Sequence, residues 1–360
     1  MLKIIDRYII RKFLGTFFYA ISLLILIVIV FDVSENIDSF IQKEAPLKAI
    51  IFDYYLNFIP YFINLFIYLF TFISVIFFTS KLAGNTEIIA ILSSGVSFRR
   101  LLYPYMISAV LLAIMSFYLG NFLIPKTNED RRVFKNNYME SLTRDKSKNL
   151  HLQIAPNTFA FVESYNSKLQ SGYKFSLEKF EGQKMIYKLM ADRIELDTVN
   201  GMWKLKNYYI RIMDSVKGQS LIKGTELDTT FSLKPEDLYK IKEVFEEMDY
   251  FELNEYIIAE KEKGSKAYKK FEVEKNKRAS GPVAIIILTI IGVALSSRKV
   301  RGGIGMHLGV GIGLTFSYIL LMQISTVFST FGNLSPFLAS WIPNIIFTFI
   351  AIYLLIKAPK

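Results

Sequence analysis

The sequence predicts a helical membrane protein with a β-rich insert: six transmembrane helices, three on either side of an external β-jelly roll or sandwich. Of its 360 residues 52% are hydrophobic and only 21% are charged, and the mean hydropathy is +0.32. Apolar runs of about 20 residues recur, which is the length that a helix needs to cross a hydrocarbon core. Between the third and fourth runs, the pattern changes to short segments in which apolar and polar residues alternate, as in strands.

The six predicted spans coincide with these apolar runs. The fourth is the weakest, because its continuous apolar part is only 14 residues long. No small-residue cleavage site follows the first run, so we expect a retained helix rather than a signal peptide. The predicted domains are residues 1–124, 125–278 and 279–360. The runs are Phe13–Phe31, Phe58–Phe78, Leu101–Ile124, Pro282–Leu295, Ile304–Phe328 and Phe337–Ile356.

The distribution of lysine and arginine predicts the orientation. The N-terminus, the loops 80–100 and 296–303 and the C-terminal tail together carry 12 basic residues, whereas the opposite loops 32–57 and 329–336 carry two. Basic residues in short loops are retained on the cytoplasmic side. We therefore expect both termini in the cytoplasm and the insert on the outer side.

Several kinds of chemistry are disfavoured by the sequence. It contains no cysteine, and its two histidines, His151 and His307, lie in unlike segments, so we expect no metal site and no cofactor. No Walker A motif occurs, so we expect no nucleotide-phosphate loop. The net charge of +11 largely reflects the basic cytoplasmic loops, and we expect no nucleic-acid binding.

The insert is predicted to be an antiparallel sandwich followed by helical connectors after Pro235. With a period of two, Phe159 and Phe161 share one face of their strand and Phe175 lies on one face of the next. We expect these three rings to line an apolar interior. The predicted strands are Thr158–Glu163, Tyr173–Phe180, Met185–Leu196 and Met202–Met213.

The cytoplasmic loop 81–100 contains a predicted short helix. Thr86 is a plausible N-cap, and Gly95 can end the helix in a left-handed conformation. Ile88, Ile91 and Leu92 share one face. Such a short helix is marginal alone, so it either lies on the lipid interface or sits in a groove of a cytoplasmic partner.

Four motifs in this plan resemble those of the LptF/LptG permeases of the lipopolysaccharide-export ABC transporter, slightly more on the LptG side. The resemblance covers essentially the whole chain. The motifs are Glu87-x-x-Ala90 with Gly95-x-Ser97, Arg278-Ala279-x-x-Pro282, Arg301-Gly302-Gly303 with His307, and Ala339-Ser340-Trp341-Ile342-Pro343-Asn344.

The resemblance implies an inner-membrane permease that extracts lipopolysaccharide and passes it to a periplasmic bridge. Its implied partners are an LptB-like cytoplasmic ATPase dimer, a paralogous permease and a single-span LptC-like jelly-roll protein. The short helix would be the ATPase-coupling element, formed by Glu87, Ile88, Ala90, Ile91, Leu92 and Gly95.

The family often has basic residues at the outer end of span one, whereas this chain has Asp32, Glu35 and Asp38 there. The candidates for contact with lipid phosphates are therefore Lys43, Lys48, Lys126, Arg131 and Arg132.

Two other functions are compatible with parts of the pattern. A membrane enzyme acting on lipid-linked sugars would use the carboxylates of loop 32–57, but their spacing shows no catalytic pair. A scaffold that merely anchors the external domain would not require six spans and a coupling-type helix. The leading prediction is thus a transport subunit without a catalytic site of its own.

Overall fold

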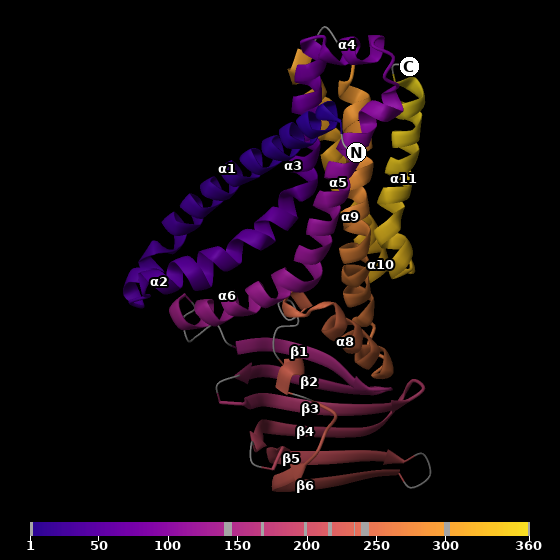
Figure 1. Ribbon diagram of the computed structural model, residues 1–360. Helices are drawn as coiled ribbons and strands as arrows, with labels where there is room; N and C mark the ends of the chain where they lie inside the picture. The colour runs from indigo at the N-terminus through magenta and orange to yellow at the C-terminus, as the bar shows by residue number, and fades with distance from the viewer. Residues whose placement is uncertain are drawn as a thin grey trace. The chain divides into compact units, whose positions relative to one another are not determined.

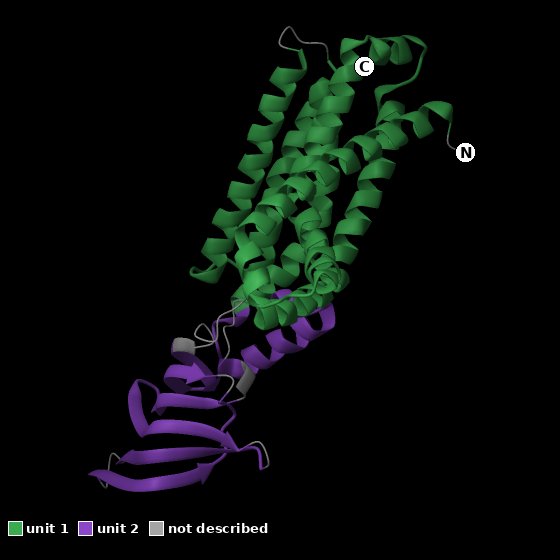
Figure 2. Cartoon of the chain, turned by 90° about the vertical axis from the view of Figure 1, so that its left-hand side faces the viewer, with its two compact units in different colours: residues 1–139, 269–360 green, residues 140–268 purple. Residues whose placement is uncertain are grey.

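The computed structural model describes residues 3–139, 146–166, 169–197, 200–214, 218–233, 235–238, 245–298 and 303–358. The chain divides into two compact units (Figure 2). The first, the helical unit, contains Met1–Met139 and Lys269–Lys360, and the second, the β unit, contains Glu140–Tyr268.

The helical unit contains six helical segments that are long and apolar enough to cross a membrane, which confirms the predicted spans. Short π-helical stretches, η1 (Ile50–Tyr55) and η2 (Leu119–Leu123), interrupt the second and third segments. In order, the segments are α1 (Ile4–Gln42), α2 (Leu47–Ala49) with η1 and α3 (Leu56–Gly84), α5 (Phe98–Tyr118) with η2 and α6 (Ile124–Tyr138), α9 (Tyr268–Ser296), α10 (Gly303–Thr330) and α11 (Pro336–Lys357) (Figure 1).

The fourth span, α9, is the most enclosed of the six. Of its most apolar stretch 67% is buried, against 22–44% in the other spans. Small residues allow this close packing: a Cβ added to Gly281 would meet the Tyr68 hydroxyl. Because α9 is surrounded by protein as well as lipid, its sequence need not be uniformly apolar, which explains the short apolar run.

The predicted domain boundary at residue 125 lies inside a continuous helical segment. α6 extends the third span to Tyr138 with mostly polar residues, and the compact β unit begins only at Glu140 and ends at Tyr268. Hydropathy reports the surroundings of the side chains, whereas backbone hydrogen bonding decides where a helix ends. The composition therefore changes before the helix does.

The β unit contains one antiparallel sheet in which each strand pairs with its neighbours in the chain (Figure 1). This confirms the predicted β domain. Within the described residues, however, the apolar face of the sheet packs against Phe231, Leu233 and Leu238 rather than against a second sheet. The Trp203 indole nitrogen donates a hydrogen bond to the Leu233 carbonyl (3.0 Å) in this layer. The strands are β1 (Lys146–Ala155), β2 (Thr158–Asn166), β3 (Ser171–Glu181), β4 (Lys184–Asp197), β5 (Met202–Asp214) and β6 (Gly218–Thr229).

The alternation of buried side chains changes phase within the strands. Three residues on alternate strands have φ angles of 50–53°, in the left-handed region: Asn149, Lys174 and Asn207. On β3, Phe175 is buried on one side of Lys174, whereas on the other side Gly172 faces the same core, where a Cβ would meet Val162 and Ile194. On the inner face of β3, the even-numbered Gly172 before Lys174 thus gives way to the odd-numbered Phe175 after it.

A charged contact ties helix α8 (Tyr250–Glu262) to the short 3-10 helix η3 (Pro235–Leu238). The Lys263 ammonium lies 3.0 Å from the Asp237 carboxylate and 3.1 Å from that of Glu260. Burial alone would lower the pKa of Lys263, but the two carboxylates outweigh it and raise the pKa above its ordinary value. The lysine is therefore charged in this contact at neutral pH.

Candidate functional site

The predicted cytoplasmic helix is present as α4 (Glu87–Ser93), and Gly95 follows it with φ +87°, as expected. Thr86 occupies the N-cap position, as predicted, but its side chain forms no capping hydrogen bond with the helix. Thr86 has φ +63°, and its hydroxyl donates to the Asn85 carbonyl (2.6 Å) instead of accepting from the helix. A capping side chain requires an extended backbone at that position. The Glu87 carboxylate accepts a hydrogen bond from the Asn85 amide (3.1 Å).

The three apolar residues of α4 share one face, as predicted, but this face packs on the chain's own core. Ile88 is only 1% exposed, and Ile91 and Leu92 are partly buried against side chains of α1, α3 and α5. Ile88 is therefore not available to a partner, which corrects its predicted role. The opposite face carries Ile89, which is 52% exposed, and Ala90. An isoleucine on the polar side of an amphipathic helix was the sequence signal for this surface.

An ion pair anchors the chain directly behind α4. The two terminal nitrogens of the Arg100 guanidinium, Nη1 and Nη2 on α5, donate to the two carboxylate oxygens of Asp6, on α1, at 2.7 and 2.6 Å. The Asp6 carboxylate is buried and also accepts from the Lys3 backbone N–H (2.8 Å). Asp6 and Arg100 are 94 positions apart, so sequence reasoning missed the pair. The first turn of α1 and the end of the α4 loop are thereby joined by a bidentate contact.

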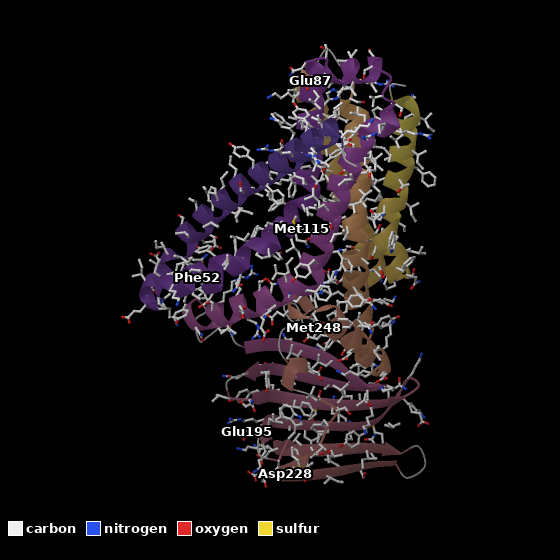
Figure 3. All side chains as sticks on the ribbon, viewed as in Figure 1. Phe52, Glu87, Met115, Glu195, Asp228 and Met248 are labelled. Atoms are coloured by element: carbon white, nitrogen blue, oxygen red, sulfur yellow. The ribbon has the colours of Figure 1, made fainter. Side chains whose placement is uncertain are left out.

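Figure 3 shows Glu87 on α4, at the end of the helical unit where the C-terminus also lies. The chain enters α5 with a regular cap, because the Ser97 hydroxyl accepts from the Arg100 backbone N–H (3.3 Å). α4 is thus held between two ordered helices, α3 and α5, with the face that contains Ile89 and Ala90 accessible.

Of the five candidate phosphate-binding cations, Lys43 follows α1, Lys48 lies on α2, and Lys126, Arg131 and Arg132 lie on α6. Lys43, Lys48, Lys126 and Arg132 are exposed. Arg131, on α6, is half-buried, with its guanidinium 5.9 Å from the Phe58 ring centre and 5.4 Å from that of Tyr61. These rings belong to α3, so Arg131 joins α6 to α3 through cation–π contacts.

The acidic C-terminal part of α1 has a packing role. The Asp32 carboxylate accepts hydrogen bonds from the hydroxyls of Tyr54 (3.2 Å) and Tyr55 (3.0 Å). An apolar cavity of about 500 Å³ lies nearby, lined from Ile29 on α1 to Ile51 on η1. Asp32, which departs from the family pattern, therefore positions two tyrosines beside an apolar space.

The predicted lining of the β unit is correct for one residue and wrong for two. Phe175 is fully buried, but Phe159 is 41% exposed and Phe161 is partly exposed on the opposite face of β2. The inner positions of β2 are Ala160 and Val162, and Val162 pairs with Phe175. Small side chains suffice there because the ring of Phe175 and the segment over the sheet fill the space. Phe159 and Phe161 were assigned to the wrong face because a large apolar side chain does not by itself show which face of a strand is buried.

The motif residues of the later spans form a buried polar network. The Asn344 amide on α11 donates to the Ser280 carbonyl on α9 (2.8 Å), and the Tyr318 hydroxyl on α10 donates to the Asn344 oxygen (2.9 Å). All three of these helices are thus joined by one asparagine. His307 contacts the Arg298 carbonyl (3.1 Å). Arg301 lies outside the described residues.

These features define a class of polytopic membrane protein. It has three spans, a β domain and three further spans, and a short helix packs against the first three spans. The comparison with family models gives a match to "Lipopolysaccharide export system permease LptF/LptG" over residues 7–357. The chain belongs to the LptF/LptG family, whose members are permeases of lipopolysaccharide export. It is accordingly a multi-pass inner-membrane transport protein. No curated protein matches the chain.

Proposed function

We propose that this chain is a permease subunit that extracts lipopolysaccharide from the inner membrane, driven by ATP hydrolysis in an LptB-like dimer bound at α4. A paralogous permease would complete the membrane part, and an LptC-like jelly-roll protein would receive the lipid from the β unit. In this arrangement both termini and α4 face the cytoplasm, as the basic loops predict.

The observation that carries the proposal is the division of α4 into two faces. Its inner face, with Ile88, is fixed to the spans, and its outer face presents Ile89 and Ala90, whereas Glu87 is half-buried. A force applied to the outer face reaches α1 through the contact of Arg100 with Asp6. The enzyme alternative gains no support, since Asp32 of the acidic loop is engaged by two tyrosine hydroxyls.

The test is Ile89→Asp, which places a carboxylate on the accessible face of α4. An unpaired charge in an interface is costly, so we expect binding of the cognate LptB-like ATPase to weaken at least about tenfold. Ile4→Asp is the matched control: Ile4 is 88% exposed on α1, outside α4. Copurification with the ATPase and lipopolysaccharide-dependent ATP hydrolysis are the readouts.

Normal ATPase binding and normal lipopolysaccharide export by Ile89→Asp would contradict the assignment of α4. Equal losses in Ile89→Asp and Ile4→Asp would also contradict it, because the effect would then come from added negative charge near the membrane. A loss confined to Ile89→Asp supports the proposal.

A further inference from the structure

A second cavity lies at the same end of the helical unit as α4, between the end of α3 and the start of α10. Its volume is about 160 Å³, roughly ten times the space that one water requires. Its described lining contains three basic side chains and no carboxylate. The lining residues are Ser80, Lys81, Gly84, Asn85, Arg298, Gly303, Ile304 and His307.

Two further features of this cavity favour an anion. It lies at the N-terminus of α10, a helix of 28 residues whose first backbone N–H groups have no partner within the helix. Independently, Ser80 is only 4% exposed, and its hydroxyl has no hydrogen-bond partner in the part of the chain that the structure describes. A buried hydroxyl without a partner is costly, and a bound oxyanion would accept its hydrogen bond.

The basic side chains are suitably placed for such a ligand. Lys81 and Arg298 form no ion pair with any described residue, so their charges are not neutralised within that part of the chain. His307 is 6% exposed, and since a carbonyl can only accept, its Nε2 donates to the Arg298 carbonyl (3.1 Å). This bond holds Arg298 against the first turns of α10. A lysine, an arginine and helix N–H groups together are typical of phosphate recognition.

We propose that this cavity binds the phosphate of an anionic membrane lipid. The first turns of α10 also expose Met306 (56%) and Val310 (42%), an apolar surface suited to acyl chains next to the basic cavity. Basic pockets between transmembrane helices commonly bind anionic headgroups. Asn85 lines the cavity and bonds Glu87, so the lipid would lie next to the start of α4. The inference does not depend on the proposed transport role.

The test measures binding to the purified full chain in detergent at 0.15 M salt. The probes are dihexanoyl phosphatidylglycerol, dihexanoyl phosphatidylcholine and inorganic phosphate. We expect phosphatidylglycerol to bind most tightly, and Lys81→Gln or Arg298→Gln to weaken it about tenfold each, as for one charge-assisted hydrogen bond. Lys12→Gln is the matched control, because Lys12 is an exposed lysine on α1 that does not line the cavity.

Ser80→Ala separates ligand binding from folding. Since the Ser80 hydroxyl has no partner among the described residues, this variant should keep or raise the melting temperature of the unliganded protein and lose part of the shift caused by phosphatidylglycerol. Equal binding of phosphatidylglycerol and inorganic phosphate would overturn the lipid assignment. Absence of binding, or losses no greater in Lys81→Gln and Arg298→Gln than in Lys12→Gln, would overturn the site.

Discussion

Two phenylalanines on neighbouring strands, Phe175 and Phe161, test which face of the sheet is the core. Phe175 is fully buried, with its ring centre 5.4 Å from that of Phe231, whereas Phe161 is partly exposed, 4.6 Å from His151. A buried phenylalanine covers about 150–250 Å², which at about 25 cal/mol per Å² corresponds to about 4–6 kcal/mol as an upper value. We therefore expect Phe175→Ala to lower the free energy of unfolding by about 3–5 kcal/mol.

Phe161→Ala should cost about 1–2 kcal/mol, because it removes one ring contact and leaves no enclosed cavity. The assay is denaturant unfolding of the full chain, followed by fluorescence of Trp203, which lies in the core of the β unit. The chain has two tryptophans, so a Trp341→Phe background makes Trp203 the sole reporter. Equal losses, or a larger loss for Phe161→Ala, would refute the assignment of Val162 and Phe175 to the inner face.

Three further outcomes follow from the described contacts. In a double-mutant cycle of Tyr318→Phe and Asn344→Leu, we expect a coupling free energy of about 0.6–1.7 kcal/mol in detergent unfolding, and additive effects would show that the hydrogen bond between them contributes nothing. Because the pKa of Lys263 is raised, its contact with Asp237 stabilises the fold fully below the ordinary lysine pKa of about 10.4 and loses this effect as the pH rises through the raised value. The melting temperatures of the wild type and Lys263→Met should therefore differ at pH 7 and converge only as the pH passes the raised pKa. A pH-independent difference would contradict the charge pairing. Gly281→Ala should lower the melting temperature because the added methyl meets a tyrosine hydroxyl, whereas Gly15→Ala, with open space around its Cβ position, should not.

The existence of helix α4 and the composition of its apolar face were predictable, but the contacts of that face were not. The amphipathic pattern of α4 correctly grouped Ile88 with its apolar neighbours, since residues three and four apart share a helix face. The same pattern cannot tell whether an apolar face meets lipid, another protein or the chain itself. Here it meets α1, α3 and α5, and Ile89 on the other side of the helix is exposed.

The candidate cations show a similar limit. The candidate basic residues could be recognised from the sequence, but the positions of their side chains relative to one another depend on how α1, α3 and α6 pack. Arg131, for example, lies over the rings of Phe58 and Tyr61. The hydrogen bonds of Tyr54 and Tyr55 to Asp32 likewise arise from packing between helices, since the tyrosines lie 22 and 23 positions from Asp32 in the chain.

The sequence by itself determined the six spans and the β insert, because crossing a hydrocarbon core requires a continuous apolar run and a half-buried strand requires alternation, and both are local patterns. Tertiary structure alone decided which phase of the alternation faces the core, because left-handed residues such as Lys174 shift it within a strand. It also decided the pairing of Asp6 with Arg100, since a contact across 94 residues depends on how two helices approach each other and leaves no periodic signal in either.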